Sequence, residues 1–174
     1  MQSNEKLDKT KLLDFLGIVE KELEREITLI AAGGTAMTLL DIKPSTHDID
    51  FTGPGDDIRL FKLLLKRIPH GYKIDCWPDG IIFSQILPED YLEKSIFTTG
   101  IKRIELRALH PRDIVVTKIG RLDDKDLEDI RDCIQKYALT EKEIVERAKQ
   151  VEYVGNQAYY DANLDVILNQ FFRK

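Results

Sequence analysis

Two glycines and two aspartates are the residues of this chain whose types and spacing first suggest chemistry. In the stretch AAGGTAMTLLDIKPSTHDIDF, Gly33 and Gly34 follow an apolar run, thirteen residues separate Gly34 from Asp48, and Asp50 stands two positions further on. A strand followed by glycines and a helix leaves backbone N–H groups open to a phosphate. The glycines therefore predict a phosphate-binding turn, with the Thr35 hydroxyl beside it. Taken alone, the same pair is also typical of an ordinary tight turn.

The two aspartates predict a metal site. Side chains alternate along a strand, so Asp48 and Asp50 point to one face while Ile49 and Phe51 enter the core. Two carboxylates at that separation repel each other unless a cation lies between them. Mg²⁺, or Mn²⁺ in its place, takes oxygen ligands and keeps phosphate oxygens in its shell. The alternative interpretation is a solvated strand end that happens to carry two acids.

A third carboxylate strengthens the metal hypothesis. Asp75, in KIDCW, has apolar neighbours and lies on the strand that follows the next expected helix. Glu105, in RIELR, is a competing candidate, but Arg103 and Arg107 lie on its own face as partners. We therefore prefer Asp75. Two metal ions held by three such carboxylates can activate an incoming hydroxyl and stabilise a leaving pyrophosphate.

Periodicity defines the elements that must position these residues. Short apolar or alternating runs predict strands, and apolar residues at helical spacing predict helices. The expected strands are 27–32, 48–53, 72–77, 81–87 and 101–109. The expected helices are 8–25, 35–42, 57–68, 111–121, 124–137, 141–152 and 160–172. Asp56 or Asp57 is expected to cap the third helix, and Thr140 with Glu143 forms a capping box.

The change from mixed elements to helices suggests two parts in one α/β (α+β) chain. Residues 1–110 would form an α/β core with an N-terminal helix, and residues 111–174 a helical subdomain packed on it. The chain of 174 residues is 43% hydrophobic and 33% charged, as expected of a globular protein. Cys76 and Cys133 lack metal-site spacing and are expected to be free thiols.

Composition also limits the expected location and partners. No apolar run approaches the ~20 residues that span a bilayer, and the polar start MQSNEKLDKT lacks the apolar region of a signal peptide. We therefore expect a cytoplasmic protein without a membrane partner. The net charge of −5 argues against broad, non-specific nucleic-acid binding.

The ordered set of motifs resembles a known superfamily. GGTAM, then THDIDF, then a separate apolar-Asp-apolar triplet is similar to nucleotidyltransferases built on the DNA polymerase β palm. Within them the chain looks closest to the AbiEii-like branch of small prokaryotic nucleotidyltransferases, some of which act as toxins in toxin–antitoxin pairs. LHPRDIVVTKIGRLDDKDLEDI extends the likeness. The resemblance covers about residues 25–135 and implies a mixed sheet with flanking helices.

The resemblance implies roles for particular residues. Gly33 and Gly34 would hold a triphosphate, and the three aspartates would bind the metals, with Asp75 also a possible base. Lys118 would contact the phosphates, with Arg121 and Asp126 close by.

The implied reaction is transfer of a nucleoside monophosphate (NMP) from a nucleoside triphosphate (NTP) to a hydroxyl on RNA or protein, with an antitoxin-like partner possible. Where many relatives carry an Arg two residues before the Thr of the T-x-D-x-D run, this chain has Pro44. The alternative is therefore a nucleotide- or partner-binding module that is weakly active or inactive, and a purely structural α/β domain is a weaker third possibility.

Overall fold

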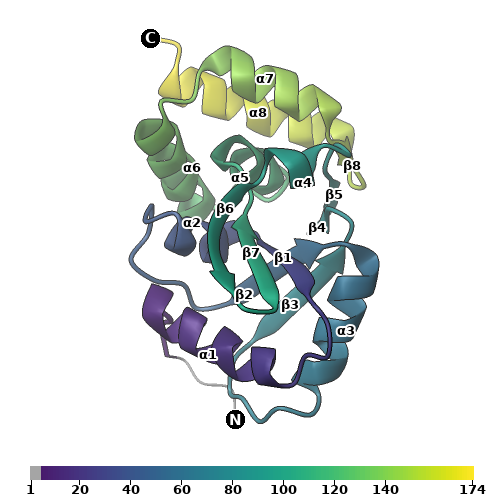
Figure 1. Cartoon of the computed structure of the whole chain (residues 1–174). Coiled ribbons are helices and arrows are strands. Elements are labelled where there is room, and N and C mark those ends of the chain that lie inside the picture. The colour runs from purple at the N-terminus through teal and green to yellow at the C-terminus, as the bar shows by residue number, and fades with distance from the viewer. Residues whose placement is uncertain (1–4) are drawn as a thin grey trace.

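The computed structural model describes residues 5–174, and its centre is a mixed five-stranded sheet (Figure 1). The strand order is β3-β2-β1-β7-β6. The strands, in chain order, are β1 (Ile27–Ala31), β2 (Ile49–Gly53), β3 (Ile74–Pro78), β6 (Ile96–Ile101) and β7 (Ile104–Ala108). β1 runs parallel to β7 and antiparallel to β2, and β2 runs parallel to β3. The predicted mixed α/β class is confirmed.

The register of β2 with β3 places two of the predicted acids side by side. Asp50 lies opposite Asp75 in this parallel pair. Ile49 and Phe51 are fully buried, as the alternation along the strand predicts. The ring of Phe51 packs edge-on against Phe61 of the following helix, with 5.6 Å between centroids. Burial of the apolar side chains thereby holds the acidic ones toward the other face.

Helices cover the sheet and extend beyond it (Figure 1). They are α1 (Lys9–Lys21), α2 (Gly33–Leu39), α3 (Gly55–Leu65), α4 (Tyr91–Lys94), α5 (Pro111–Lys118), α6 (Asp124–Tyr137), α7 (Glu141–Gln150) and α8 (Gln157–Phe171). α3 packs against β1, β2 and β3, and α2 against β1, β2 and β7. α5 lies on α2 and is itself covered by α6 and α7. The purple α1 and the yellow α8 lie at opposite ends of the molecule.

A second, small sheet lies beside the main one. It consists of β4 (Ile81–Ile82), β5 (Gln85–Ile86) and β8 (Glu152–Tyr153) in the order β4-β5-β8. The prediction of one continuous strand over 81–87 is wrong, because Phe83 and Ser84 form a turn within it. β8 pairs with β5 although it belongs to the C-terminal residues. The division of the chain at residue 110 stays a prediction.

Other local differences have simple physical reasons. β6 was not predicted from the sequence; it is antiparallel to β7 and depends on that neighbour for its hydrogen bonds. The predicted Asp cap of α3 is also wrong, because Pro54 occupies the N-cap position. Asp57 instead accepts a hydrogen bond from the Thr28 backbone and pairs with Arg25. The capping box of Thr140 with Glu143 is confirmed.

A buried ion pair fastens α7 to α5. Arg147 and Asp113 are 3% and 0% exposed and form two hydrogen bonds of 2.5 and 2.9 Å. Arg147 also donates to Asp90, at 2.8 Å. The pair fixes α5, the helix that ends at Lys118, because a buried charge must remain paired.

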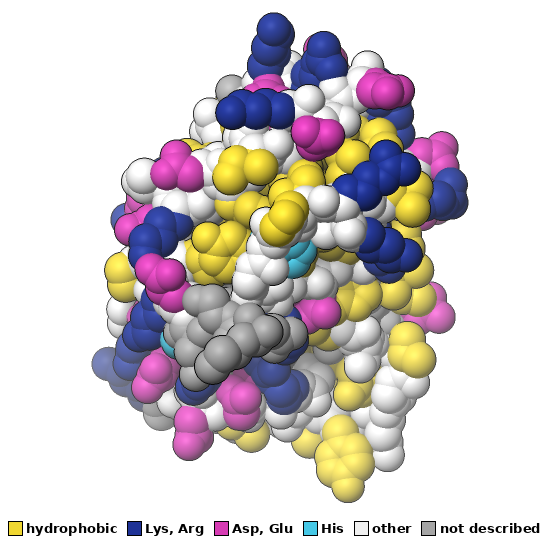
Figure 2. Space-filling model, turned by 90° about the horizontal axis from the view of Figure 1, so that it is seen from below, with side chains coloured by type: hydrophobic (Ala, Val, Ile, Leu, Met, Phe, Trp, Pro, Cys, Tyr) yellow, Lys and Arg dark blue, Asp and Glu magenta, His cyan; other side chains and the backbone are white. Residues whose placement is uncertain are grey.

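Charge on the outer surface is mixed on the face shown in Figure 2. There, basic and acidic side chains alternate among hydrophobic ones, without a broad field of either sign among the residues that are described. None of the helices within residues 5–174 is both long enough and apolar enough to cross a membrane.

Candidate active site

The three predicted aspartates converge on one cavity. Asp48, directly before β2, Asp50 on β2 and Asp75 on β3 all line a cavity of about 490 Å³. Gly33 and Gly34, at the start of α2, line it as well. Two motifs thirteen residues apart in the sequence thus meet because β1 and β2 are neighbouring strands of the sheet.

Glu105, the competing candidate for the third carboxylate, lies elsewhere. It is on β7, opposite Thr28 of β1, and it pairs with Arg107 at 2.9 Å. It does not line the cavity that holds Asp48 and Asp50 but a separate groove, which Lys102 and Arg103 also line. The register of the sheet therefore favours Asp75, which lies directly across from Asp50.

The surroundings of Asp50 strongly perturb its carboxyl group. Its side chain is 8% exposed, and its pKa is raised from 3.8 to about 7. Burial is the largest cause, followed by the negative charges of Asp75 and Asp48, while Lys118 and Lys73 lower it. A bound cation would offset both main causes, because it favours the ionised carboxylate.

A lysine that the sequence analysis missed lies among the acids. Lys73 Nζ is 3.5 Å from Asp48 Oδ2 and 3.9 Å from Asp75 Oδ2. The alternation of strand side chains gave a signal for it, because Lys73 stands two residues before Asp75. Its ammonium group supplies positive charge to two of the carboxylates that were predicted to bind metal.

The donor chemistry of the three acids fits a divalent cation, but their present positions do not form a ready ligand set. Among the described residues, no group of three or more His, Cys, Asp and Glu side chains is placed to hold a metal ion. Asp48 and Asp75 face Lys73 instead. Binding of a metal by all three acids therefore requires the two exposed ones to turn away from the lysine.

Threonines hold the aspartate segment in place. Thr35 is fully buried, and its Oγ1 donates to the carbonyl of Asp48 and accepts from the N–H of Asp50. Thr46 Oγ1 donates to the same carbonyl at 2.8 Å. Thr35 was predicted to offer its hydroxyl to a phosphate. In this structure the hydroxyl is already hydrogen bonded on both sides, so Thr35 positions the acids.

The two glycines allow close packing at the cavity wall. Gly33 has φ +50°, and a Cβ there would lie 3.2 Å from Asp50 Oδ2. A Cβ on Gly34 would lie 2.8 Å from Thr46 Oγ1. A larger residue in place of Gly33 would therefore strain the backbone, and one in place of Gly34 would displace the Thr46 side chain. The helix begins at Gly33 itself, two residues earlier than the sequence predicted.

The predicted cations at the end of α5 are held by acids of α6. Lys118 is only 6% exposed and lies 3.3 Å from Asp126 and 3.0 Å from Asp129. Arg121 donates two hydrogen bonds of 2.8 Å to Asp126. Asp129 was missed, although it stands three residues after Asp126 on a helix.

The run RLDDKDLEDIRD has the mixed i,i+4 charges that predict a mainly exposed helix, but it is not a wholly solvent-exposed face. Asp126 is fully buried, and Asp129 is 8% exposed. Asp126 also completes the capping box of α6 with Asp123. The cavity that Asp48, Asp50 and Asp75 line is also lined by Lys118, Arg121 and Asp126. The prediction was that Arg121 and Asp126 lie close to Lys118.

Comparison with known protein families identifies the chain. A family described as "Nucleotidyltransferase of unknown function (DUF6036)" matches residues 11–171, nearly the whole sequence. The chain belongs to this nucleotidyltransferase family. The resemblance to the nucleotidyltransferase superfamily is thereby confirmed, whereas the AbiEii-like branch is not.

Solved structures give only a distant likeness. One is a crystal structure of ANT(2'')-Ia in complex with adenylyl-2''-tobramycin, at 13% identity and TM-score 0.49, covering 94% of this chain and 98% of that one. Another is a solution structure of the antibiotic-resistance factor ANT(2'')-Ia, with the same identity and TM-score, covering 95% of each chain. No curated protein matches this nucleotidyltransferase.

Proposed function

We propose that this nucleotidyltransferase moves the NMP of an NTP to a hydroxyl group on RNA or protein and releases pyrophosphate. The observation that carries the proposal is the meeting of Asp48, Asp50 and Asp75 with Gly33 and Gly34 in one cavity. Membership of a nucleotidyltransferase family supports the reaction class.

The roles follow from the chemistry of the cavity. Asp48, Asp50 and Asp75 would hold Mg²⁺ or Mn²⁺, which when bound neutralises phosphate charge and favours an ionised acceptor oxygen. The backbone N–H groups of Gly33 and Gly34 would donate to the triphosphate. The acceptor oxygen forms a bond to the α-phosphorus, and the bond from that phosphorus to the bridging oxygen breaks with its electron pair leaving on pyrophosphate. Asp75, which is half exposed, would take the acceptor's proton.

Lys118 and Arg121 would support the phosphates through charge. Both line the cavity, yet Asp126 and Asp129 already neutralise part of their charge. Phosphate oxygens must therefore share these cations with the acids of α6. An antitoxin-like partner and a cytoplasmic location belong to the same proposal and rest on the sequence motifs and composition.

A second candidate function is nucleotide binding without turnover. The ion pairs of Lys73 with Asp48 and Asp75 favour it, because they leave these two acids paired without a metal. Pro44, in place of the Arg of many relatives, points the same way.

Calorimetric titration with each of the four NTPs, with and without Mg²⁺, tests the proposal. We expect metal-dependent binding of at least one NTP by the wild type and its loss in an Asp48→Ala/Asp50→Ala double variant. Asp56→Ala, a change at an exposed acid of α3, serves as the control and should bind normally. Labelled NTP would then reveal a modified acceptor. Binding without any acceptor labelling favours the second candidate, and absence of binding by folded wild type contradicts both.

A further inference from the structure

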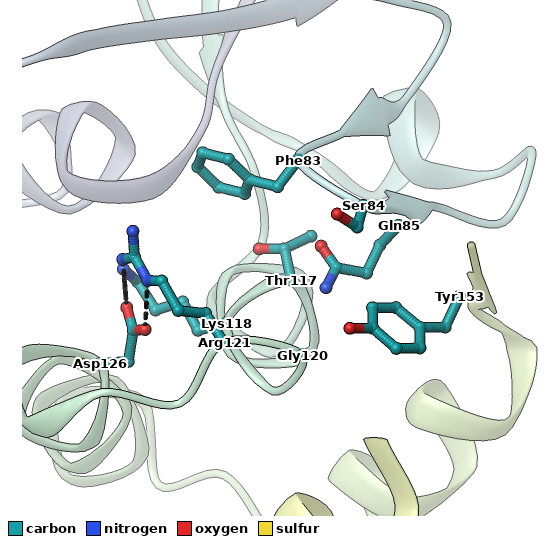
Figure 3. A pocket seen from close by; sticks show the side chains of 9 residues that line it. All are labelled: Phe83, Ser84, Gln85, Thr117, Lys118, Gly120, Arg121, Asp126 and Tyr153. Atoms are coloured by element: carbon teal, nitrogen blue, oxygen red, sulfur yellow. Dashed lines mark hydrogen bonds and ion pairs between the residues drawn. The ribbon is translucent and has the colours of Figure 1, made fainter. Parts of the chain in front are cut away.

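A second cavity continues from the site of the aspartates. It has a volume of about 190 Å³ and lies between the β4–β5 turn, the end of α5 and β8 (Figure 3). Four of its lining residues also line the first cavity: Phe83, Lys118, Arg121 and Asp126. A ligand whose phosphates lie near the aspartates could therefore extend into this second cavity without leaving the protein surface.

We propose that this second cavity holds the base of the donor nucleotide, with Phe83 stacked on the base and Gln85 accepting a hydrogen bond from its amino group. The inference rests on the proposed function, because it places the base of the same NTP. It adds a substrate class: the donor is ATP or CTP, whose bases carry an amino group at C6 of the purine or C4 of the pyrimidine, where GTP, inosine triphosphate and UTP carry a keto oxygen.

Phe83 is placed where a stacking side chain is needed. It lies at the junction of the two cavities, and its ring tip is 3.7 Å from where a Cβ on Gly33 would stand. The side chain is 42% exposed, so the core does not hold it. Trp77 supports the ring edge-on, with centroids 5.0 Å apart. Aromatic faces presented in this way bind bases through stacking.

The backbone at Phe83 is also unusual. Its φ is +54°, a conformation that a bulky aromatic residue rarely adopts. Such strain persists only where the surrounding structure imposes it, and it concentrates at functional sites. The turn thereby directs the Phe83 ring toward Gly33 and the cavities rather than into the main core.

Gln85 presents a fixed hydrogen-bond acceptor. Only one orientation of its amide satisfies its neighbours: Nε2 then donates to the carbonyls of Ile82 and Thr117, at 3.0 Å each. Figure 3 draws the opposite orientation, which lacks both bonds. In the satisfied orientation Oε1 faces Gly120, 2.6 Å from where a Cβ would stand there.

A fixed acceptor discriminates between bases. Adenine and cytosine carry an exocyclic amino group that can donate to Oε1 of Gln85, whereas hypoxanthine and uracil carry a keto oxygen at that position. The keto oxygen would leave two acceptors facing each other. If the Gln85 amide turned so that Nε2 donated to the keto oxygen, it would lose its two hydrogen bonds to the carbonyls of Ile82 and Thr117. We therefore expect the cavity to bind the keto bases less tightly.

Matched nucleotide pairs test the inference directly. We would titrate the wild type, in the presence of Mg²⁺, with ATP against inosine triphosphate (ITP) and with CTP against UTP. We expect the amino member of the preferred pair to bind at least about fivefold more tightly than its keto partner. Gln85→Met, which keeps the side-chain length but removes the amide, should bring the ratio close to one.

Phe83 variants separate stacking from amino-group recognition. Phe83→Leu should weaken ATP and ITP by the same factor, about tenfold, because stacking does not depend on the exocyclic group. Phe83→Tyr, which keeps the ring, is the control and should bind both nearly as the wild type does. Weakening of only one nucleotide by Phe83→Leu would contradict the stacking role.

The outcomes also distinguish a failure of this inference from a failure of the proposed function. If ATP and ITP, and CTP and UTP, bind equally to wild type, the base cavity is refuted while NTP binding stands. The same holds if Gln85→Met keeps the wild-type preference. Should that variant not fold, the wild-type pairs still decide. Binding of no nucleotide refutes the proposed function and this inference together.

Discussion

Replacing Asp50 with asparagine should stabilise the protein, and the gain should depend on pH. Asp50 is nearly buried, and its folded pKa of about 7 lies well above the ordinary value of 3.8. Between these two values the unfolded chain releases a proton that the folded protein retains. Stability is therefore lost as the pH rises from about 4 to about 7, and it stays low above that range.

The pKa shift sets the size of the effect. A shift from 3.8 to about 7 corresponds to roughly 4 kcal/mol at most, since each unit is worth about 1.4 kcal/mol. Asp50→Asn has no carboxylate to bury. We expect it to be about 2–4 kcal/mol more stable than the wild type near pH 8 and nearly equal to it near pH 4. Groups that do not interact with Asp50 titrate alike in both proteins, so their contributions cancel. The range of about 2–4 kcal/mol allows for the neighbours that do interact with it, which are Asp48, Asp75, Lys73 and Lys118.

Urea unfolding in the presence of a chelator, at intervals from about pH 4 to about pH 8.5, measures this difference. Asp56→Asn is the matched control, because the Asp56 side chain is 83% exposed. It should change stability by less than about 0.5 kcal/mol at every pH. Parallel curves for wild type and Asp50→Asn across the whole range would refute the reasoning, because they would mean that the Asp50 carboxyl is not perturbed by folding.

Two further predictions concern ion pairs. Asp113→Ala should lower the free energy of unfolding by about 3–5 kcal/mol, because it leaves the buried Arg147 without its partner on α5. Glu141→Ala, which breaks an exposed pair with Arg173, is the control and should lower the free energy of unfolding by less than about 1 kcal/mol. If urea unfolding gave equal losses for the two variants, burial would not be the reason for the effect of Asp113→Ala. Lys73→Met should bind Mg²⁺ more tightly than the wild type in calorimetry without nucleotide, because the lysine no longer competes for the acids. Unchanged or weaker Mg²⁺ binding would count against that competition.

The sequence predicted the strands that carry Asp50 and Asp75 well because their signal is local. Alternation along 48–53 places Ile49 and Phe51 in the core and Asp50 on the opposite side, and this follows from strand geometry alone. The apolar neighbours of Asp75 likewise marked it as a strand residue. In contrast, β6 and β8 lack such a pattern and exist through pairing with β7 and β5, so they could not be found from their own residues.

The acids of α6 show a different limit. Their spacing resembles an exposed helix with mixed charges, and burial depends on which face meets α5. Asp126 and Asp129 are buried because that face carries the partners of Lys118. The charge run itself does not reveal this, since ion pairs between helices depend on packing rather than on local spacing.

By itself, the sequence determined the residue types and the order of the motifs. It also determined on which side of each strand a side chain lies, because that depends only on the two-residue period of a strand. Tertiary structure alone decided that Asp75 rather than Glu105 faces Asp50, because strand order and register are long-range properties of the sheet. It also decided that Lys73 lies between two acids and that Phe83 and Gln85 border a cavity beside them. Distances between side chains far apart in the sequence arise only when the whole chain is packed.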